Sequence, residues 1–208
     1  MAQVIPAILE KDFGEIERKI QMVAKWVDWV QIDIADNTLV PNTTFLDAAP
    51  FKNLKTSLKL EVHMMVKDPI KYLQGYIDSG FKRIIAHVEG DHIEDFIVKG
   101  EEANIEVGLA IDGPTQLEKI APYLRNIDVV LVMAIEAGFS GQEYREDTGE
   151  KIRKIKEMEF DLPIAVDGAM NLENAKKVVS AGATRINSNS YIFGAEDIKG
   201  AVQSLKEL

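Results

Sequence analysis

Four ionisable side chains in this 208-residue sequence each end a short apolar, strand-like run: Asp33, His63, His87 and Asp167. Carboxylates and imidazoles can transfer protons, and both are good ligands for zinc and other first-row divalent ions. Either aspartate alone is equally well explained as a helix cap or a loop residue. Because the carboxyl ends of parallel strands meet on one face of an α/β fold, where such folds do chemistry, the four together predict one shared site.

Asp33 and Asp167 are the candidates for an acid–base pair. Two carboxylates on opposite sides of a barrel mouth can work together, since one removes a proton from a carbon acid and the other returns a proton to the far face. When that proton is α to a carbonyl group, its removal builds an enediolate. The negative charge of the enediolate then needs a metal ion or hydrogen-bond donors.

Small and polar residues follow the sixth, seventh and eighth strand-like runs. Any one of these loops could be an ordinary turn, but loops at these places in a barrel often bind phosphate through backbone N–H groups. Met65 and Met133 also stand at strand ends, where they either pack in the core or form an apolar cap over the reacting carbon. The predicted substrate and phosphate contacts are His63, Met65, Met133, Gly138, Phe139, Ser140, Gly141, Gln142, Gly168, Ala169, Asn189 and Ser190.

The elements that position these residues alternate along the whole sequence. Apolar, β-branched runs lie near 3–8, 28–34, 58–63, 83–88, 106–111, 127–133, 162–166 and 184–188. Amphipathic segments with helical spacing lie between them, at 13–23, 69–79, 91–102, 146–158, 171–180 and 195–208. The segment 34–57 is the exception, with a weak helical signal and a long polar loop.

Eight strand–helix units in 208 residues predict a compact α/β fold, a (β/α)8 TIM barrel of one domain spanning residues 1–208. A doubly wound open sheet would need fewer strands and usually a glycine-rich first turn. The first run instead ends in Pro6, Ala7, Ile8 and Leu9, without glycine.

Composition narrows the class of protein. The formal net charge of −10 argues against a nucleic-acid partner, while a small anionic substrate can still be held locally by backbone N–H groups. Cysteine is absent, which excludes disulfide and thiolate chemistry. The N-terminal residues do not resemble a signal peptide, and no apolar run reaches the length of a membrane span. We therefore expect a soluble, cytoplasmic protein without a membrane partner.

With these motifs the sequence resembles the ribulose-phosphate 3-epimerase family, nearly from end to end. The similarity is carried by residues 5–9, 31–37, 40–45, 62–66, 68–69, 86–89, 132–142 and 166–168. The resemblance implies a (β/α)8 barrel that interconverts ribulose 5-phosphate and xylulose 5-phosphate in the pentose phosphate pathway. It implies that Asp33 and Asp167 are the acid–base pair, and that with His63 and a second histidine they bind a divalent metal. A small phosphorylated sugar is the expected partner, and a homo-oligomer the expected assembly.

The second histidine of the family is replaced by Gln31. An amide oxygen is a much poorer zinc ligand than imidazole, so we expect a metal (zinc, manganese, iron, cobalt or magnesium) to bind weakly or not at all. Further departures from the family lie nearby, at Ala7, Ala35, Asn37, Ala137, Ser140, Ala169 and Asn189. A sugar-phosphate-binding barrel with little or no epimerase activity is therefore the alternative. Decarboxylases related to orotidine-monophosphate decarboxylase are disfavoured, because their Asp-x-Lys-x-x-Asp run is absent.

Overall fold

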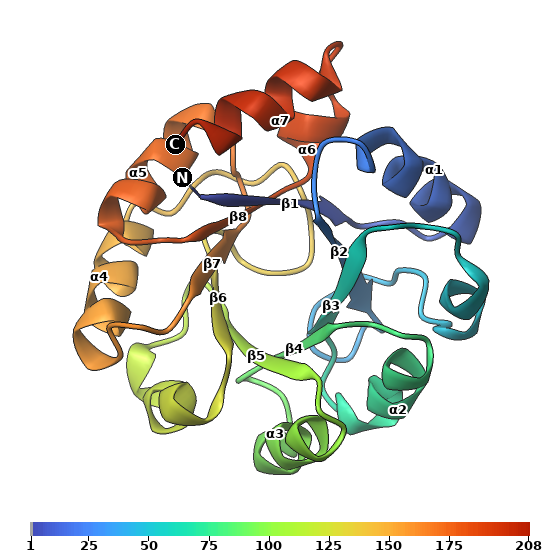
Figure 1. Cartoon of the computed structure of the whole chain (residues 1–208). Helices are drawn as coiled ribbons and strands as arrows, with labels where there is room; N and C mark the ends of the chain where they lie inside the picture. Colours follow the sequence, from blue (N-terminus) through green and yellow to red (C-terminus); the bar gives the residue numbers. More distant parts are fainter. Residues whose placement is uncertain (1) are drawn as a thin grey trace.

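The computed structural model describes residues 2–208, which form a closed barrel of eight parallel strands in sequence order (Figure 1). The strands are β1 (Gln3–Ile8), β2 (Trp29–Ala35), β3 (Lys59–Met65), β4 (Arg83–His87), β5 (Glu106–Ile111), β6 (Val129–Met133), β7 (Ile164–Asp167) and β8 (Arg185–Ser188). Strand β1 pairs with both β2 and β8, which closes the sheet. The predicted (β/α)8 barrel is confirmed, because each strand lies where an apolar run indicated it.

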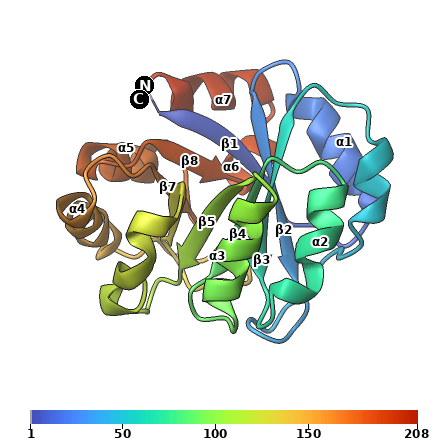
Figure 2. The ribbon, with the colours of Figure 1, turned by 60° about the horizontal axis from the view of Figure 1, so that its bottom comes forward.

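Helices surround the barrel as an outer ring, as the two views in Figures 1 and 2 show. The α-helices are α1 (Phe13–Val23), α2 (Ile70–Asp78), α3 (Ile93–Glu102), α4 (Thr148–Met158), α5 (Leu172–Ala181), α6 (Ser190–Phe193) and α7 (Ile198–Lys206). Short 3-10 helices complete the ring: η1 (Ala49–Asn53), η2 (Leu117–Lys119) and η3 (Ala121–Asn126). Within residues 2–208, no helix is both long enough and apolar enough to cross a membrane.

Local signals in the sequence explain where several helices begin. Asp12, Asn171 and Asp197 cap α1, α5 and α7, and the side chain of each accepts a hydrogen bond from a backbone N–H of the first turn. The amphipathic segment predicted from 195 therefore becomes helical only after Asp197. The segment 34–57 carries only the 3-10 helix η1, in agreement with its weak helical signal.

Strand register brings distant residues to the same level of the barrel. Asp33 of β2 lies beside His63 of β3, and Asp167 of β7 lies beside Asn187 of β8. Gln31 stands two residues before Asp33, so both side chains leave the same face of the strand. That face is the barrel interior, where both side chains are buried. Register and the two-residue period of the strand thus create a polar layer in a largely apolar core.

Candidate active site

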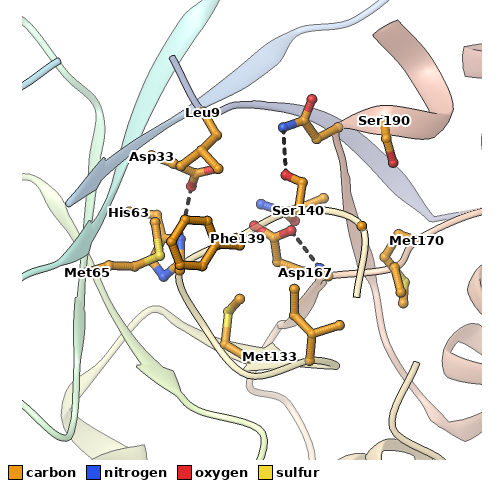
Figure 3. A pocket seen from close by; sticks show the side chains of 17 residues that line it. Leu9, Asp33, His63, Met65, Met133, Phe139, Ser140, Asp167, Met170 and Ser190 are labelled. Atoms are coloured by element: carbon orange, nitrogen blue, oxygen red, sulfur yellow. Dashed lines mark hydrogen bonds and ion pairs between the residues drawn. The ribbon is translucent and has the colours of Figure 1, made fainter. Parts of the chain in front are cut away.

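A cavity of about 510 Å³, counting the space open to solvent, lies at the carboxyl ends of the strands (Figure 3). The residues that line it are Leu9, Asp33, His63, Met65, Met133, Ile135, Gly138, Phe139, Ser140, Gly141, Asp167, Gly168, Ala169, Met170, Asn187, Asn189 and Ser190.

Asp33, His63 and Asp167 converge at the inner end of the cavity. One ligand atom from each lies within 4.8 Å of the other two, which is close enough for a shared metal ion. The Nδ1 atom of His63 lies 2.9 Å from Oδ1 of Asp33. All three side chains are more than nine-tenths buried. The structure therefore brings together two carboxylates and an imidazole that the sequence separates by up to 134 positions (33 to 167).

Gln31 bridges the two carboxylates with its amide group. Its Nε2 donates one hydrogen bond to Oδ1 of Asp33 at 2.8 Å and another to Oδ2 of Asp167 at 2.6 Å. The backbone N–H of Gly168 donates to the other oxygen of Asp167 at 2.6 Å. Gln31 therefore presents hydrogen-bond donors, rather than its carbonyl oxygen, to the groups that could hold a metal.

Burial shifts the pKa values of both aspartates towards neutrality. Burial raises the pKa of Asp33 to about 8, although the hydrogen bond from Gln31 opposes the rise. Burial, together with the nearby negative charge of Asp33, raises the pKa of Asp167 to about 7. Two carboxyl groups this close resist double ionisation, so the pair favours one acid and one base near neutral pH. That is the protonation state required for proton removal on one side and proton return on the other.

His87 lies behind His63 and does not line the cavity, although the sequence pattern placed it at the same mouth. The two imidazoles meet through their Nε2 atoms at 2.8 Å, and Nδ1 of His87 lies 3.0 Å from Oε2 of Glu89. Burial raises the pKa of Glu89, but the hydrogen bond and charge of His87, together with hydrogen bonds from Thr115 and the Asp112 backbone, outweigh burial and lower the pKa to about 2. When a neutral His87 donates to Glu89 it accepts from His63, which turns the Nδ1 lone pair of His63 towards Asp33. A metal-binding histidine usually donates its other ring N–H to an acceptor in this way, and here the acceptor is His87.

The three predicted loops converge on the outer part of the cavity. Asn189 donates to the Ser140 hydroxyl at 3.3 Å, which joins the loop after β6 to the loop after β8. Gln142 is the predicted contact that does not line the cavity, since its amide donates to the backbone carbonyls of Glu136 and Phe139. It holds the shape of its own loop instead. Met65 and Met133, for which two interpretations were open, both line the cavity.

Two of the departures that the resemblance implies lie at positions with a left-handed backbone. Asn37 has φ of 65° and Ala169 has φ of 54°, both in the left-handed region where glycine is usual. Between Asp167 and Ala169, Gly168 has φ of +96°, and a Cβ there would lie 2.4 Å from a side-chain carbon of Ile135. Position 168 therefore needs glycine because a Cβ would overlap Ile135. At position 169 an alanine fits, and only the left-handed backbone disfavours it.

Sequence reasoning missed four of the lining residues: Leu9, Ile135, Met170 and Asn187. Leu9 and Ile135 follow strands β1 and β6 within two residues, so their positions alone could have indicated the mouth. Asn187 lies inside β8, whose residues are mostly polar, so its polarity does not distinguish it from its neighbours. Its inward direction follows only from the register of β8 against β7.

Comparison with known proteins agrees with this geometry. Residues 3–193 match the model of the ribulose-phosphate 3 epimerase family. The ribulose-phosphate 3-epimerase of Rhodobacter capsulatus is 36% identical over 92% of this chain and 86% of its own length. The protein of that name from Bacillus subtilis (strain 168) is 31% identical over 99% of both chains. The solved 3-keto-L-gulonate-6-phosphate decarboxylase from Vibrio cholerae shares the fold, with a TM-score of 0.78 and 14% identity over 99% of this chain and 96% of that one.

Proposed function

We propose that this chain, which belongs to the ribulose-phosphate 3-epimerase family, interconverts ribulose 5-phosphate and xylulose 5-phosphate or a related ketose phosphate. The observation that carries the proposal is the pairing of Asp33 and Asp167 across one cavity, each with a pKa raised towards neutrality. Binding a sugar phosphate requires neither carboxylate, whereas proton removal from one face of a carbon and proton return to the other uses two proton carriers. Family membership supports a place for the reaction in the pentose phosphate pathway.

In the proposed reaction one ionised aspartate removes the proton from C3, next to the C2 carbonyl group of the ketose. The C3–H bond breaks, its electron pair forms the enediolate, and the proton moves to the carboxylate oxygen. The other aspartate, protonated at the start, delivers its proton to the opposite face of C3, and the electron pair returns to the new C–H bond. The two aspartates finish with exchanged protonation states, so solvent protons must restore the pair before the next turnover in the same direction.

The residues present fit a divalent metal at three positions. Asp33, His63 and Asp167 would hold it, because their ligand atoms lie within 4.8 Å of one another. When bound, such an ion stabilises negative charge that develops on a substrate oxygen. Gln31 does not fit as a fourth ligand in the orientation that the structure shows, because its N–H groups face the carboxylates.

The outer cavity suits a phosphate group. The loops at 138–141, 168–169 and 189–190 offer backbone N–H groups together with the hydroxyls of Ser140 and Ser190. Lysine and arginine are absent from the lining residues, so an anion would be held by dipoles rather than by charged side chains. Nearer the aspartates, Met65 and Met133 would cover the reacting carbon and limit the access of water.

A coupled assay on ribulose 5-phosphate tests the proposal, with chelator-treated protein and with added zinc, manganese or magnesium. Asp33→Asn and Asp167→Asn should each lower turnover about 10²–10⁴-fold, because each removes one of two proton carriers. The exposed Asp161→Asn variant changes the charge equally and should leave turnover unchanged. Reaction in deuterium oxide should place deuterium at C3.

The alternative is a barrel that binds a sugar phosphate without epimerising it. Gln31 favours it, because the resemblance implies a metal-binding histidine at that position and only Asp33, His63 and Asp167 group as possible ligands among the described residues 2–208. Binding of ribulose 5-phosphate without turnover, and without exchange of deuterium into C3 under any of the metal conditions, would establish the alternative and exclude the epimerase.

A further inference from the structure

The amide of Gln31 uses all of its hydrogen-bonding groups. Its two N–H groups reach Asp33 and Asp167, and its carbonyl oxygen accepts a hydrogen bond from Nδ2 of Asn187 at 2.6 Å. The side chain is fully buried. Turning the amide over would set its NH2 group against the NH2 group of Asn187 and its carbonyl against two carboxyl groups, of which at least one is ionised. Both reversed contacts are repulsive, and water cannot compensate for them in a buried position.

Asn187 is itself held in one orientation. Its Nδ2 also donates to Oε1 of Glu61 at 3.0 Å, so the same NH2 group serves two acceptors. The other oxygen of Glu61 pairs with Arg83. This buried ion pair with Arg83 holds Glu61 as a carboxylate that accepts hydrogen bonds. A carboxylate cannot satisfy the carbonyl of Asn187, and so the NH2 group must face it.

Arg83 anchors the lower end of this series of contacts. Its guanidinium also pairs with Glu106 through Nε at 2.7 Å and through another nitrogen at 2.6 Å. The guanidinium carbon lies 4.0 Å from the centre of the Trp29 ring. A group held by two carboxylates and an aromatic face has little freedom to move. Arg83 therefore fixes the acceptor role of Glu61, and through Glu61 it fixes the direction of the hydrogen bonds of Asn187 and Gln31.

We propose that Gln31 is a positioning residue whose N–H groups hold the two aspartates, and that the series Arg83, Glu61 and Asn187 fixes its orientation. Its carbonyl oxygen is then unavailable as a metal ligand. The role as a positioning residue rests on the proposed epimerase function, whereas the orientation of the amide does not. A metal ion at the Asp33 and Asp167 oxygens must compete with these N–H groups, which gives a physical reason for weak metal binding.

The zinc affinity of chelator-treated protein tests whether Gln31 donates hydrogen bonds to the aspartates or binds the metal as a ligand. Gln31→Leu replaces the amide by an apolar side chain of similar bulk. The zinc affinity of this variant should equal or exceed that of the unmodified protein. Asp167→Asn removes a true ligand and should lower the affinity at least about tenfold. The exposed Gln116→Leu variant is the matched control for the substitution. A tenfold or greater loss of affinity in Gln31→Leu would show that the carbonyl oxygen binds the metal and would overturn the proposal.

Direct observation of the amide keeps the proposal testable if Gln31→Leu fails to fold. In the unmodified, metal-free protein, NMR couplings across hydrogen bonds should connect Nε2 of Gln31 with the carboxyl carbons of Asp33 and Asp167. A coupling from Nε2 to the side-chain carbonyl of Asn187 instead would show the reversed orientation and refute the series of contacts.

Turnover distinguishes this proposal from the proposed function. Gln31 touches the aspartates but does not line the cavity, so Gln31→Leu should lower kcat and leave KM nearly unchanged. The expected amide couplings in a protein that epimerises no ketose phosphate would contradict the proposed function alone. Full kcat in a folded Gln31→Leu variant would contradict the positioning role alone.

Discussion

Replacing Asp33 by asparagine should stabilise the metal-free protein at alkaline pH while it removes an acid–base group. The pKa of Asp33 is raised from 3.8 to about 8 by burial. The folded protein therefore binds more protons than the unfolded chain between these values. The stability that protonated Asp33 contributes is fully present below about pH 4 and is lost as pH rises towards about pH 8. Asparagine does not titrate, so the variant escapes this loss.

The magnitude follows from the shift. Each pKa unit corresponds to about 1.4 kcal/mol, so a rise of about four units costs up to about 6 kcal/mol once Asp33 is ionised in the fold. The substitution also removes the repulsion between Asp33 and Asp167, because the charge of Asp33 contributes to the raised pKa of Asp167. The oxygen of an asparagine can still accept the hydrogen bond that Gln31 donates. The net gain in the free energy of unfolding should reach several kcal/mol near pH 8.

Urea unfolding of chelator-treated protein measures this gain. The difference between Asp33→Asn and the unmodified protein should grow from under about 1 kcal/mol near pH 4 to several kcal/mol near pH 8. Asp161→Asn, at an exposed position, should show no such growth. A variant that is less stable than the unmodified protein near pH 8 would refute the reasoning, because it would mean that the folded site favours the ionised carboxylate.

Three further predictions concern the metal, the anion and the backbone. Gln31→His should raise zinc affinity at least about tenfold in a competitive chelator titration, and an unchanged affinity would contradict the account of the site. Titration with inorganic phosphate should shift the backbone amide resonances of Gly141 and Gly168, and resonances that stay fixed would place the anion elsewhere. Ala169→Gly should not destabilise the fold and should stabilise it by up to about 1 kcal/mol, because it relieves left-handed strain. Gly168→Ala should destabilise by about 2 kcal/mol or more, because its Cβ would press on Ile135, and urea unfolding of both variants checks the contrast.

Much of the fold was predictable because its determinants are local. The alternation of apolar runs with amphipathic segments indicated the barrel, whereas chain length alone would have allowed many other folds. The capping residues Asp12, Asn171 and Asp197 act within one helical turn, so helix starts can be read from neighbouring residues. The helix predicted from 195 began later than its amphipathic pattern because the cap at Asp197, rather than the pattern, sets the first turn.

The gathering of Asp33, His63 and Asp167 was also predictable, because each ends a parallel strand and such ends share one face. The same rule placed His87 at that face, but it could not show that His63 would stand between His87 and the cavity. Strand register does not place His87 deeper, because His63 pairs with Ile85, two residues before His87. The His87 ring is instead held by its contacts with His63 and Glu89, which only the folded chain brings together.

The sequence by itself indicated the barrel and the strand ends at its mouth, and its resemblance to the family implied a histidine where Gln31 stands. Only the tertiary structure decided what Gln31 does, since an amide can accept or donate and the sequence does not state which end faces the site. The choice is made by Asn187, 156 positions away, and by Glu61 and Arg83 beneath it. A hydrogen bond takes its direction from the partner that cannot change role. Here those partners are a buried carboxylate and a guanidinium brought together by strand register.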